Sequence, residues 1–128
     1  MSTPSAISRE IRDIASEITV EPPKGADIIA RLWRGWAEPG KADEYQRHYE
    51  DEVSVHLTGV HGFRGARLLR RVEGDEVAFI SITFFTSMHA VRGFAGDHPE
   101  KAVVEEHARQ VLSRWDDEVT HHEVVVDL

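Results

Sequence analysis

A predicted β-hairpin over residues 63–85 limits the folds open to this chain. The segment Glu76–Phe85 is rich in β-branched and aromatic residues, and the segment Phe63–Val72 before it also reads as a strand. The intervening Glu73-Gly74-Asp75 has the turn chemistry of a short hairpin loop. We therefore predict two adjacent antiparallel strands at the centre of the sequence.

Alternation along Glu76–Phe85 divides its side chains between two faces. We expect a buried face made of apolar side chains, namely Ala78, Ile80, Ile82 and Phe84. The opposite face is semi-polar yet aromatic, and carries Phe79, Ser81, Thr83 and Phe85. We expect this second face, together with Val125, to lack a cover of helices. It is too apolar to remain in contact with water, so we predict that a second copy of the chain covers it.

The flanking segments complete the pattern. We expect a first strand over residues 28–33, a helix over residues 41–55 and a helix capped by Ser87 that runs through Phe94. A further helical segment is expected over residues 99–112 and a last strand over residues 119–126. The order β-α-β-β-α-β predicts an α+β, ferredoxin-like fold. With its uncovered face, it predicts a homodimer that forms a dimeric α+β barrel.

The first 26 residues differ from the rest. Ile7, Ile11, Ile14 and Ile18 recur at helical spacing, and Pro22-Pro23 end that pattern. We therefore divide the chain into an amino-terminal helical arm with its linker, residues 1–26, and a ferredoxin-like domain, residues 27–128. We predict that the arm docks against the helices or the partner subunit, because an isolated helix of this length does not stay folded.

Charge and cysteine content exclude several classes of function. The formal net charge is −8, which disfavours a nucleic-acid partner. The chain has no cysteine, which excludes thiolate nucleophiles and cysteine-based metal sites. Neither a signal peptide nor an apolar run of membrane-spanning length is present, so we expect a cytoplasmic protein without a membrane partner.

Several short segments resemble antibiotic biosynthesis monooxygenase (ABM) domains in their order and spacing. They are Ile29–Gly35, Ala42–Tyr45, Arg64–Ala66, Leu69–Arg71, Ser87 with Ala90, Phe94–Gly96 and Glu118–Val124. The resemblance covers about residues 28–126. It implies the dimeric α+β barrel already expected from periodicity, with a cleft in each monomer between the helices and the sheet. Members of the family include cofactor-independent quinone-forming oxygenases, haem-degrading enzymes and small-molecule-binding proteins.

The resemblance also bears on individual residues. The haem-degrading members use an asparagine, a tryptophan and a histidine at positions that correspond to Trp33, Phe85 and His107 here. Only the histidine is retained, which argues against haem degradation and leaves a haem-binding protein with His107 as axial ligand as an alternative. Trp33, Tyr49 and Phe85 are expected to form aromatic walls suited to a planar substrate. Ordinary core packing is the competing interpretation for each of these residues.

Eight histidines raise the question of acid–base or metal chemistry. No HExxH or regular HxH array is present, so we expect no metal site and no resident cofactor. His56 follows the first helix and His107 lies on the late helix, so both can reach the cleft, where a neutral imidazole serves as a general base. A hydrogen-bonded structural histidine is the common alternative.

The leading hypothesis is an ABM-like enzyme that converts an aromatic or polyketide-like compound by cofactor-independent oxygenation or base-assisted chemistry. The rival hypothesis is a non-catalytic ligand-binding dimer.

Overall fold

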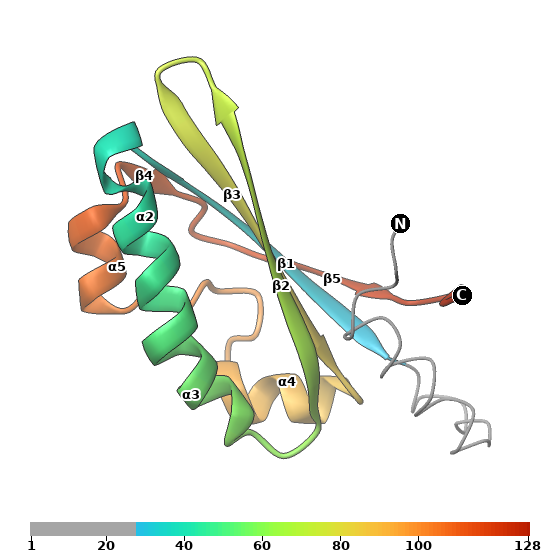
Figure 1. The fold of residues 1–128 in the computed structure, drawn as a ribbon. Helices are drawn as coiled ribbons and strands as arrows, with labels where there is room; N and C mark the ends of the chain where they lie inside the picture. Colours follow the sequence, from blue (N-terminus) through green and yellow to red (C-terminus); the bar gives the residue numbers. More distant parts are fainter. Residues whose placement is uncertain (1–27) are drawn as a thin grey trace.

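The computed structural model describes residues 28–128, so the expected amino-terminal arm lies outside the described part of the chain. An antiparallel sheet of five strands packs one face against a layer of helices (Figure 1). The strands follow the order β2-β3-β1-β4, and β5 also pairs with β1. This arrangement confirms the expected α+β, ferredoxin-like fold.

The central hairpin has the expected bounds within one residue. β2 spans Phe63–Glu73 and β3 spans Glu76–Phe85, with Gly74 at positive φ in the turn between them. β1 spans Ile29–Ala37 and extends past its expected end, because it remains paired with β3 along its whole length. Every one of these neighbouring strands is antiparallel.

The carboxyl-terminal strand is shorter than expected. β4 (Arg114–Trp115) and β5 (Thr120–Glu123) both pair with β1, and the expected strand over residues 119–126 is correct only in its central part. The ladder ends where Glu123 pairs with Ile29, because Ile29 is the first residue of β1. Residues beyond this point have no strand beside them in the described part of the chain, and Val125 is 81% exposed.

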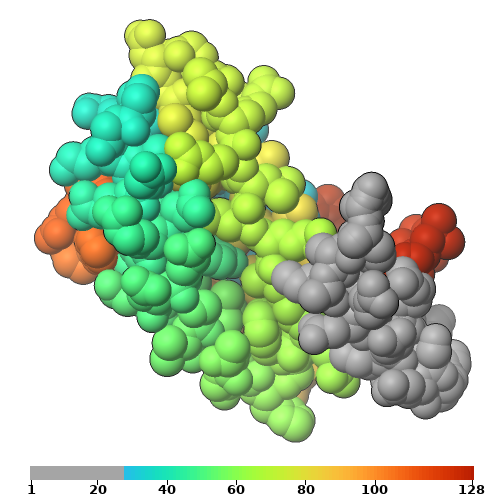
Figure 2. Space-filling view, in the orientation of Figure 1, coloured from blue at the N-terminus to red at the C-terminus, as the bar shows by residue number. Residues whose placement is uncertain are grey.

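The first helical region is one continuous rod with an irregular centre. α2 (Pro39–His48) leads into a π-helical turn over Tyr49–Val53, and α3 (Ser54–Thr58) continues it. The expected helix over residues 41–55 lies within this rod, and the π-helical turn was not expected. In the space-filling view, the surface of this rod runs beside β2, with α5 at its outer edge (Figure 2).

The second helical region agrees in part. α4 spans Met88–Ala95 and begins as expected at Ser87, whose hydroxyl accepts a hydrogen bond from the Ala90 amide at 3.1 Å. α5 covers only Glu106–Val111, so the expected helix over residues 99–112 is wrong in its first half. There the chain instead forms a short bridge in which Lys101 pairs with Glu118. Two backbone hydrogen bonds accompany it, from the Ala102 amide to the Asp117 carbonyl and from the Val119 amide to the Glu100 carbonyl.

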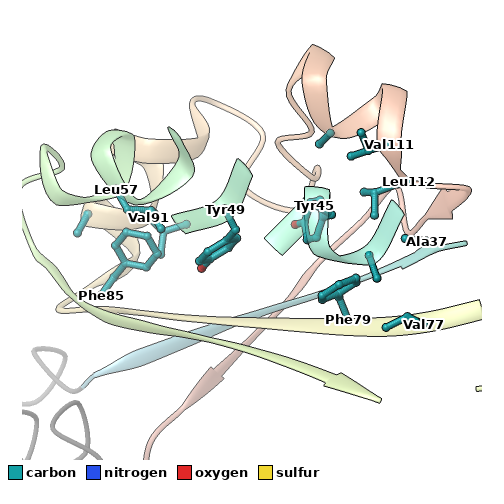
Figure 3. Close-up of a cluster of buried hydrophobic side chains, with 13 residues drawn as sticks. Ala37, Tyr45, Tyr49, Leu57, Val77, Phe79, Phe85, Val91, Val111 and Leu112 are labelled. Carbon is teal, nitrogen blue, oxygen red and sulfur yellow. The ribbon is translucent and has the colours of Figure 1, made fainter. Parts of the chain in front are cut away.

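The core lies between the helices and the sheet, and it corrects the expected orientation of β3. Phe79 and Phe85 are fully buried against the helices, beside Tyr45 and Tyr49 (Figure 3). The alternate side chains of β3 are only half-buried and face away from the helices, namely Ala78, Ile80, Ile82 and Phe84. The two faces of β3 are thus exchanged relative to the expectation. Within residues 28–128 no helix covers this other face. It carries Ile80 and Ile82 on β3, with Arg34 and Arg67 paired beside them on the neighbouring strands.

Gly62 joins the helical rod to β2 at a position where a side chain has no room. Its φ is +93°, and an added Cβ would lie 2.6 Å from the Cβ of Ala90 on α4. The Gly62 carbonyl accepts a hydrogen bond from the Thr86 amide at 2.9 Å. This glycine lets the two connections at one end of the sheet pack against each other.

Among residues 28–128, no helix has both the length and the apolar character needed to cross a bilayer.

Candidate functional site

A cavity of about 60 Å³ lies between the sheet, the helical rod and the segment that precedes α5. Its apolar wall includes Trp33, Tyr45, Val53, Leu57, Phe94 and Val104. Its polar wall includes Arg31, His48, Tyr49, Ser81, Thr83 and Glu105. The position matches the cleft that the sequence predicts, and an aromatic wall with a few polar groups is typical of small-molecule sites. The volume holds a few water molecules, so a larger ligand requires the walls to move apart.

Trp33 forms one aromatic wall, as expected. Its indole nitrogen donates a hydrogen bond to the Asp116 carbonyl at 2.8 Å, which fixes the ring beside the cavity. The Trp33 and Tyr45 ring centroids are 6.5 Å apart, and Tyr45 in turn packs edge-on against Phe79 at 4.8 Å. This stack holds the wall rigid because each ring is positioned by the next.

Two tyrosine hydroxyls are buried at the cavity. Burial raises the pKa of Tyr49 and of Tyr45 above the ordinary value, so both remain neutral phenols. The Tyr49 hydroxyl lies 3.4 Å from the Ser81 hydroxyl, which is itself buried on β3. Tyr49 therefore presents a neutral hydroxyl at the cavity wall, where Tyr45 also lies.

Arg31 ties the cavity to the carboxyl-terminal half of the chain. Its buried guanidinium donates to the carbonyls of Pro99 at 2.6 Å and Lys101 at 2.9 Å. It also lies 3.0 Å from Nε2 of His121 on the neighbouring β5. Burial lowers the pKa of Arg31 to about 10, so it stays protonated at neutral pH. This contact set holds residues 99–101 against the sheet.

The contact with Arg31 predicts a pH dependence at His121. A guanidinium has only donors, so Nε2 of His121 must accept, and the imidazole is neutral in the folded protein. Burial, followed by the charge of Arg31, lowers the pKa of His121 below its ordinary value. Its contribution to stability is thus present above the unfolded pKa of about 6.5 and lost as the pH falls below it. We expect the free energy of unfolding, measured with urea between pH 8 and 5, to fall less with decreasing pH in His121→Gln than in the parent protein. The same pH dependence in both proteins would contradict this prediction.

The imidazole that lines the cavity is His48, which the sequence analysis did not select. Its side chain has no exposed surface, and its ring contacts both Tyr45 and His107. Neither ring nitrogen has a hydrogen bond of acceptable geometry, although carboxylate oxygens of Glu52 and Glu105 lie 3.3 and 3.5 Å away. A buried imidazole without good partners is unusual, because burying unpaired polar atoms costs free energy.

The two histidines expected as bases lie outside the cavity wall, and only the ring of His107 contacts His48. His107 on α5 is 36% exposed, and its two nitrogens lie 3.3 Å from Glu44 and 3.4 Å from Glu52. The hydrogen bond with Glu44, and then Glu52, raises the pKa of His107. His56 on α3 is half exposed, and its Nδ1 lies 3.5 Å from Glu105. Glu52 therefore bridges His48 to His107, and Glu105 bridges His48 to His56.

Phe85, the third expected wall residue, does not line the cavity. Its ring is fully buried and packs between Phe63 and Phe94, at centroid distances of 6.2 and 6.1 Å. Phe94 takes the place at the cavity wall and separates Phe85 from it. The packing interpretation therefore describes Phe85 in this structure.

A sequence signal for His48 does exist. Ala42, Tyr45 and Tyr49 form the apolar stripe of the helical rod, and His48 lies on the same stripe three residues after Tyr45. A histidine on the buried face of a helix, next to a second buried aromatic residue, indicates a polar group inside the core. Arg31 and Glu105 carry no comparable signal, because the fold alone brings them to the cavity.

Comparison with family models and with curated proteins gives no match. Two solved structures share the fold. A candidate antibiotic biosynthesis monooxygenase from Bacillus cereus is 12% identical, with a TM-score of 0.57, over 80% of this chain and 97% of that one. A variant of MhuD with two manganese protoporphyrin IX molecules bound per active site is 22% identical, with a TM-score of 0.55, over 79% and 97%. The chain thus has the expected fold of ABM proteins.

Proposed function

We propose that the protein is a small-molecule enzyme that binds an aromatic or polyketide-like compound between the helices and the sheet and removes a proton from it. The observation that carries this proposal is a buried imidazole without good hydrogen-bond partners, His48, in the wall of an aromatic cavity. A group of this kind is placed to act as a general base. The fold shared with an ABM protein supports the same class of chemistry.

The neighbours of His48 suit this role. Glu52 and Glu105 lie beside the ring and stabilise the imidazolium that forms when His48 takes a proton. The neutral hydroxyl of Tyr49 is positioned to donate a hydrogen bond to the oxygen on which charge develops. Glu52 lies between His48 and His107, and Glu105 lies between His48 and His56. We propose that these two outer histidines pass the proton to solvent.

Oxygenation extends this chemistry without a cofactor. Deprotonation of an activated methylene group leaves a carbanion stabilised by the aromatic system. Reaction with O₂ then places one oxygen atom in a new carbonyl group, and the second oxygen leaves as water with the two methylene hydrogens. The carbon is oxidised and O₂ is reduced, so the electrons balance.

A haem-binding function has one observation in its favour, since a protein of the same fold binds a porphyrin. The residues described here do not fit the group in this arrangement. His107 does not line the cavity, and both its nitrogens are engaged by Glu44 and Glu52. We therefore assign no step to haem.

The test compares turnover of variants on a panel of phenolic and polyketide-like aromatic compounds, followed by absorbance and oxygen consumption. We expect His48→Gln to lower turnover by about 10²–10⁴-fold, as for loss of a positioned base. His107→Ala should lower turnover with little change in melting temperature, because its side chain is partly exposed. The exposed His98 supplies the control, and His98→Gln should retain full activity.

Two results would contradict the enzyme. If compounds bind tightly without any turnover, the protein is the non-catalytic ligand-binding alternative. If His48→Gln retains turnover on a compound that the parent protein converts, His48 is a structural residue and not a base.

We further propose that the protein is a homodimer in which the helix-free face of the sheet is the interface. On β3, Ile80, Ile82 and Phe84 are apolar and only half-buried, and the described helices all pack on the other side. A second copy covers such a face with a self-complementary surface. No nucleic-acid or membrane partner is proposed.

A further inference from the structure

His48 belongs to a cluster that the proposed reaction does not fully explain. Its ring nitrogens lack hydrogen bonds of good geometry, although the side chain is completely buried. A base needs one free nitrogen, whereas here two are unsatisfied. A buried imidazole in this environment is suited to bind a further ligand.

Nδ1 of His48 and Nδ1 of His107 converge on the same carboxylate. One oxygen of Glu52 lies 3.3 Å from Nδ1 of His48, and the other lies 3.4 Å from Nδ1 of His107. These distances are long for hydrogen bonds between charged groups. They are close to the separation of about 3.4 Å between two ligands of one tetrahedral ion with bonds near 2.1 Å. The two contacts use different oxygens of Glu52, so the three side chains have to move slightly together to bind one ion. One ligand atom from each of the three residues lies within 4.8 Å of the others.

The opposite nitrogen of each ring faces a second carboxylate. Nε2 of His107 lies 3.3 Å from Glu44, and Nε2 of His48 lies 3.5 Å from Glu105. Metal-binding histidines usually direct their second nitrogen to a carboxylate or carbonyl group, which fixes the tautomer and the ring orientation. Both imidazoles thus have an outer partner on one side and share Glu52 on the other.

We propose that His48, Glu52 and His107 bind one divalent first-row transition-metal ion, with Glu44 and Glu105 as outer partners of the two histidines. Two imidazoles and one carboxylate suit zinc, iron(II), cobalt or manganese, and disfavour magnesium and calcium, which prefer oxygen ligands. The exposed side of the cluster, where the Glu52 side chain is 54% exposed, gives an ion access from solvent. His48 places the ion next to the cavity. With Nδ1 on the ion and Nε2 directed at Glu105, His48 has no lone pair left, so the metal-bound form does not use it as the general base of the proposed function.

The sequence conceals this site. His48 and Glu52 are four residues apart on the helical rod, but His107 comes from α5, and only the packing of α2 against α5 brings it near. The three residues therefore form no contiguous motif, and the expectation of no metal site followed from that absence. A simple ion-pair cluster is the competing interpretation. In that interpretation, the carboxylates of Glu44, Glu52 and Glu105 surround two imidazoles. The cluster then carries an excess of negative charge, which a divalent cation would neutralise.

The test measures metal binding and does not depend on the proposed reaction. Full-length protein is dialysed against a chelator and titrated with zinc and then with cobalt, by calorimetry and by visible absorption. We expect one equivalent of zinc, visible cobalt bands of nitrogen and oxygen ligation, and no competition from magnesium at a hundredfold excess. Glu52→Gln and His107→Ala should each weaken zinc binding by more than about 100-fold, and Glu44→Gln by about 10–100-fold.

Matched variants separate this site from adventitious binding. Glu52 and His107 are partly exposed, so their variants should retain the parent circular dichroism spectrum and remain informative if His48→Gln fails to fold. His98→Gln, at an exposed histidine, should bind zinc like the parent protein. Undiminished binding in Glu52→Gln and His107→Ala would overturn the proposal. Loss of zinc binding in His89→Ala would also overturn it. His89 lies with His56 and His61 in a separate hollow, so that result would place the zinc there.

Discussion

Replacing Ile80 by aspartate is expected to convert the protein from a dimer to a monomer. Light scattering coupled to size exclusion should show the mass fall from twice 14.5 kDa to that of a single chain. Two carboxylates, one from each subunit, would enter an apolar interface, and each buried charge costs several kcal/mol. We therefore expect a dissociation constant at least about 1,000-fold higher.

The same substitution should leave the single chain folded. Ile80 is only half-buried within one chain, so an aspartate at this position stays in contact with water in the monomer. Val55→Asp supplies the matched control, because Val55 is 67% exposed on α3, away from the sheet. That variant should remain a dimer. A mass of 14.5 kDa for the unmodified protein at micromolar concentration would contradict the dimer itself.

Replacing Phe85 by alanine is expected to lower the free energy of unfolding by about 3–5 kcal/mol. The ring has no exposed surface and packs between Phe63 and Phe94, so its removal leaves a cavity that the surrounding chain fills poorly. Urea unfolding, followed by circular dichroism, measures the change. It is best made in the Ile80→Asp protein, where only contacts within one chain count.

Phe84 gives the matched comparison, because it is the adjacent residue on the opposite face of β3. Its ring is only half-buried within one chain, so Phe84→Ala should cost less than about 2 kcal/mol in the same protein. The ratio of the two effects tests the orientation of the strand. A larger loss for Phe84→Ala would show that the core lies on the isoleucine face.

The difficulty with β3 shows what alternation can and cannot predict. The bounds of the strand followed from β-branched and aromatic residues, and the structure confirms them. The orientation did not follow, because both faces carry large apolar groups. Ile80 and Ile82 look more like core residues than Ser81 and Thr83, yet the two hydroxyl residues face the helices, at the cavity. The polar residues on the helix-facing side of β3 line the cavity. The apolar residues on its other side are consistent with the proposed dimer interface.

The limits of prediction at the site have a similar cause. The family resemblance implies a place at the cleft for Trp33, and the helix face that Tyr49 shares with Tyr45 leaves open which of the two hydroxyls meets the cavity. His56 and His107 come from elements near the cleft, but His48, about two turns before His56 on the same rod, occupies the wall. Helix periodicity predicts the direction of a side chain around the helix axis only to within about one residue. The π-helical turn after His48 changes the direction of the side chains that follow it. Contacts such as that of Arg31 with Pro99 join distant segments and follow only from the folded chain.

The π-helical turn over Tyr49–Val53 has a consequence for comparing this chain with its relatives. Each residue of an α-helix advances the chain by about 100°, and a π-turn absorbs one additional residue without ending the helix. The turn lies between His48 and Leu57, which both line the cavity, so it sets which residue of α3 faces the wall. A homologue one residue shorter here would keep the fold while a different residue of α3 took the place of Leu57. Sequence alignments should therefore place single-residue gaps within residues 49–53, where a gain or loss of length changes the cavity wall.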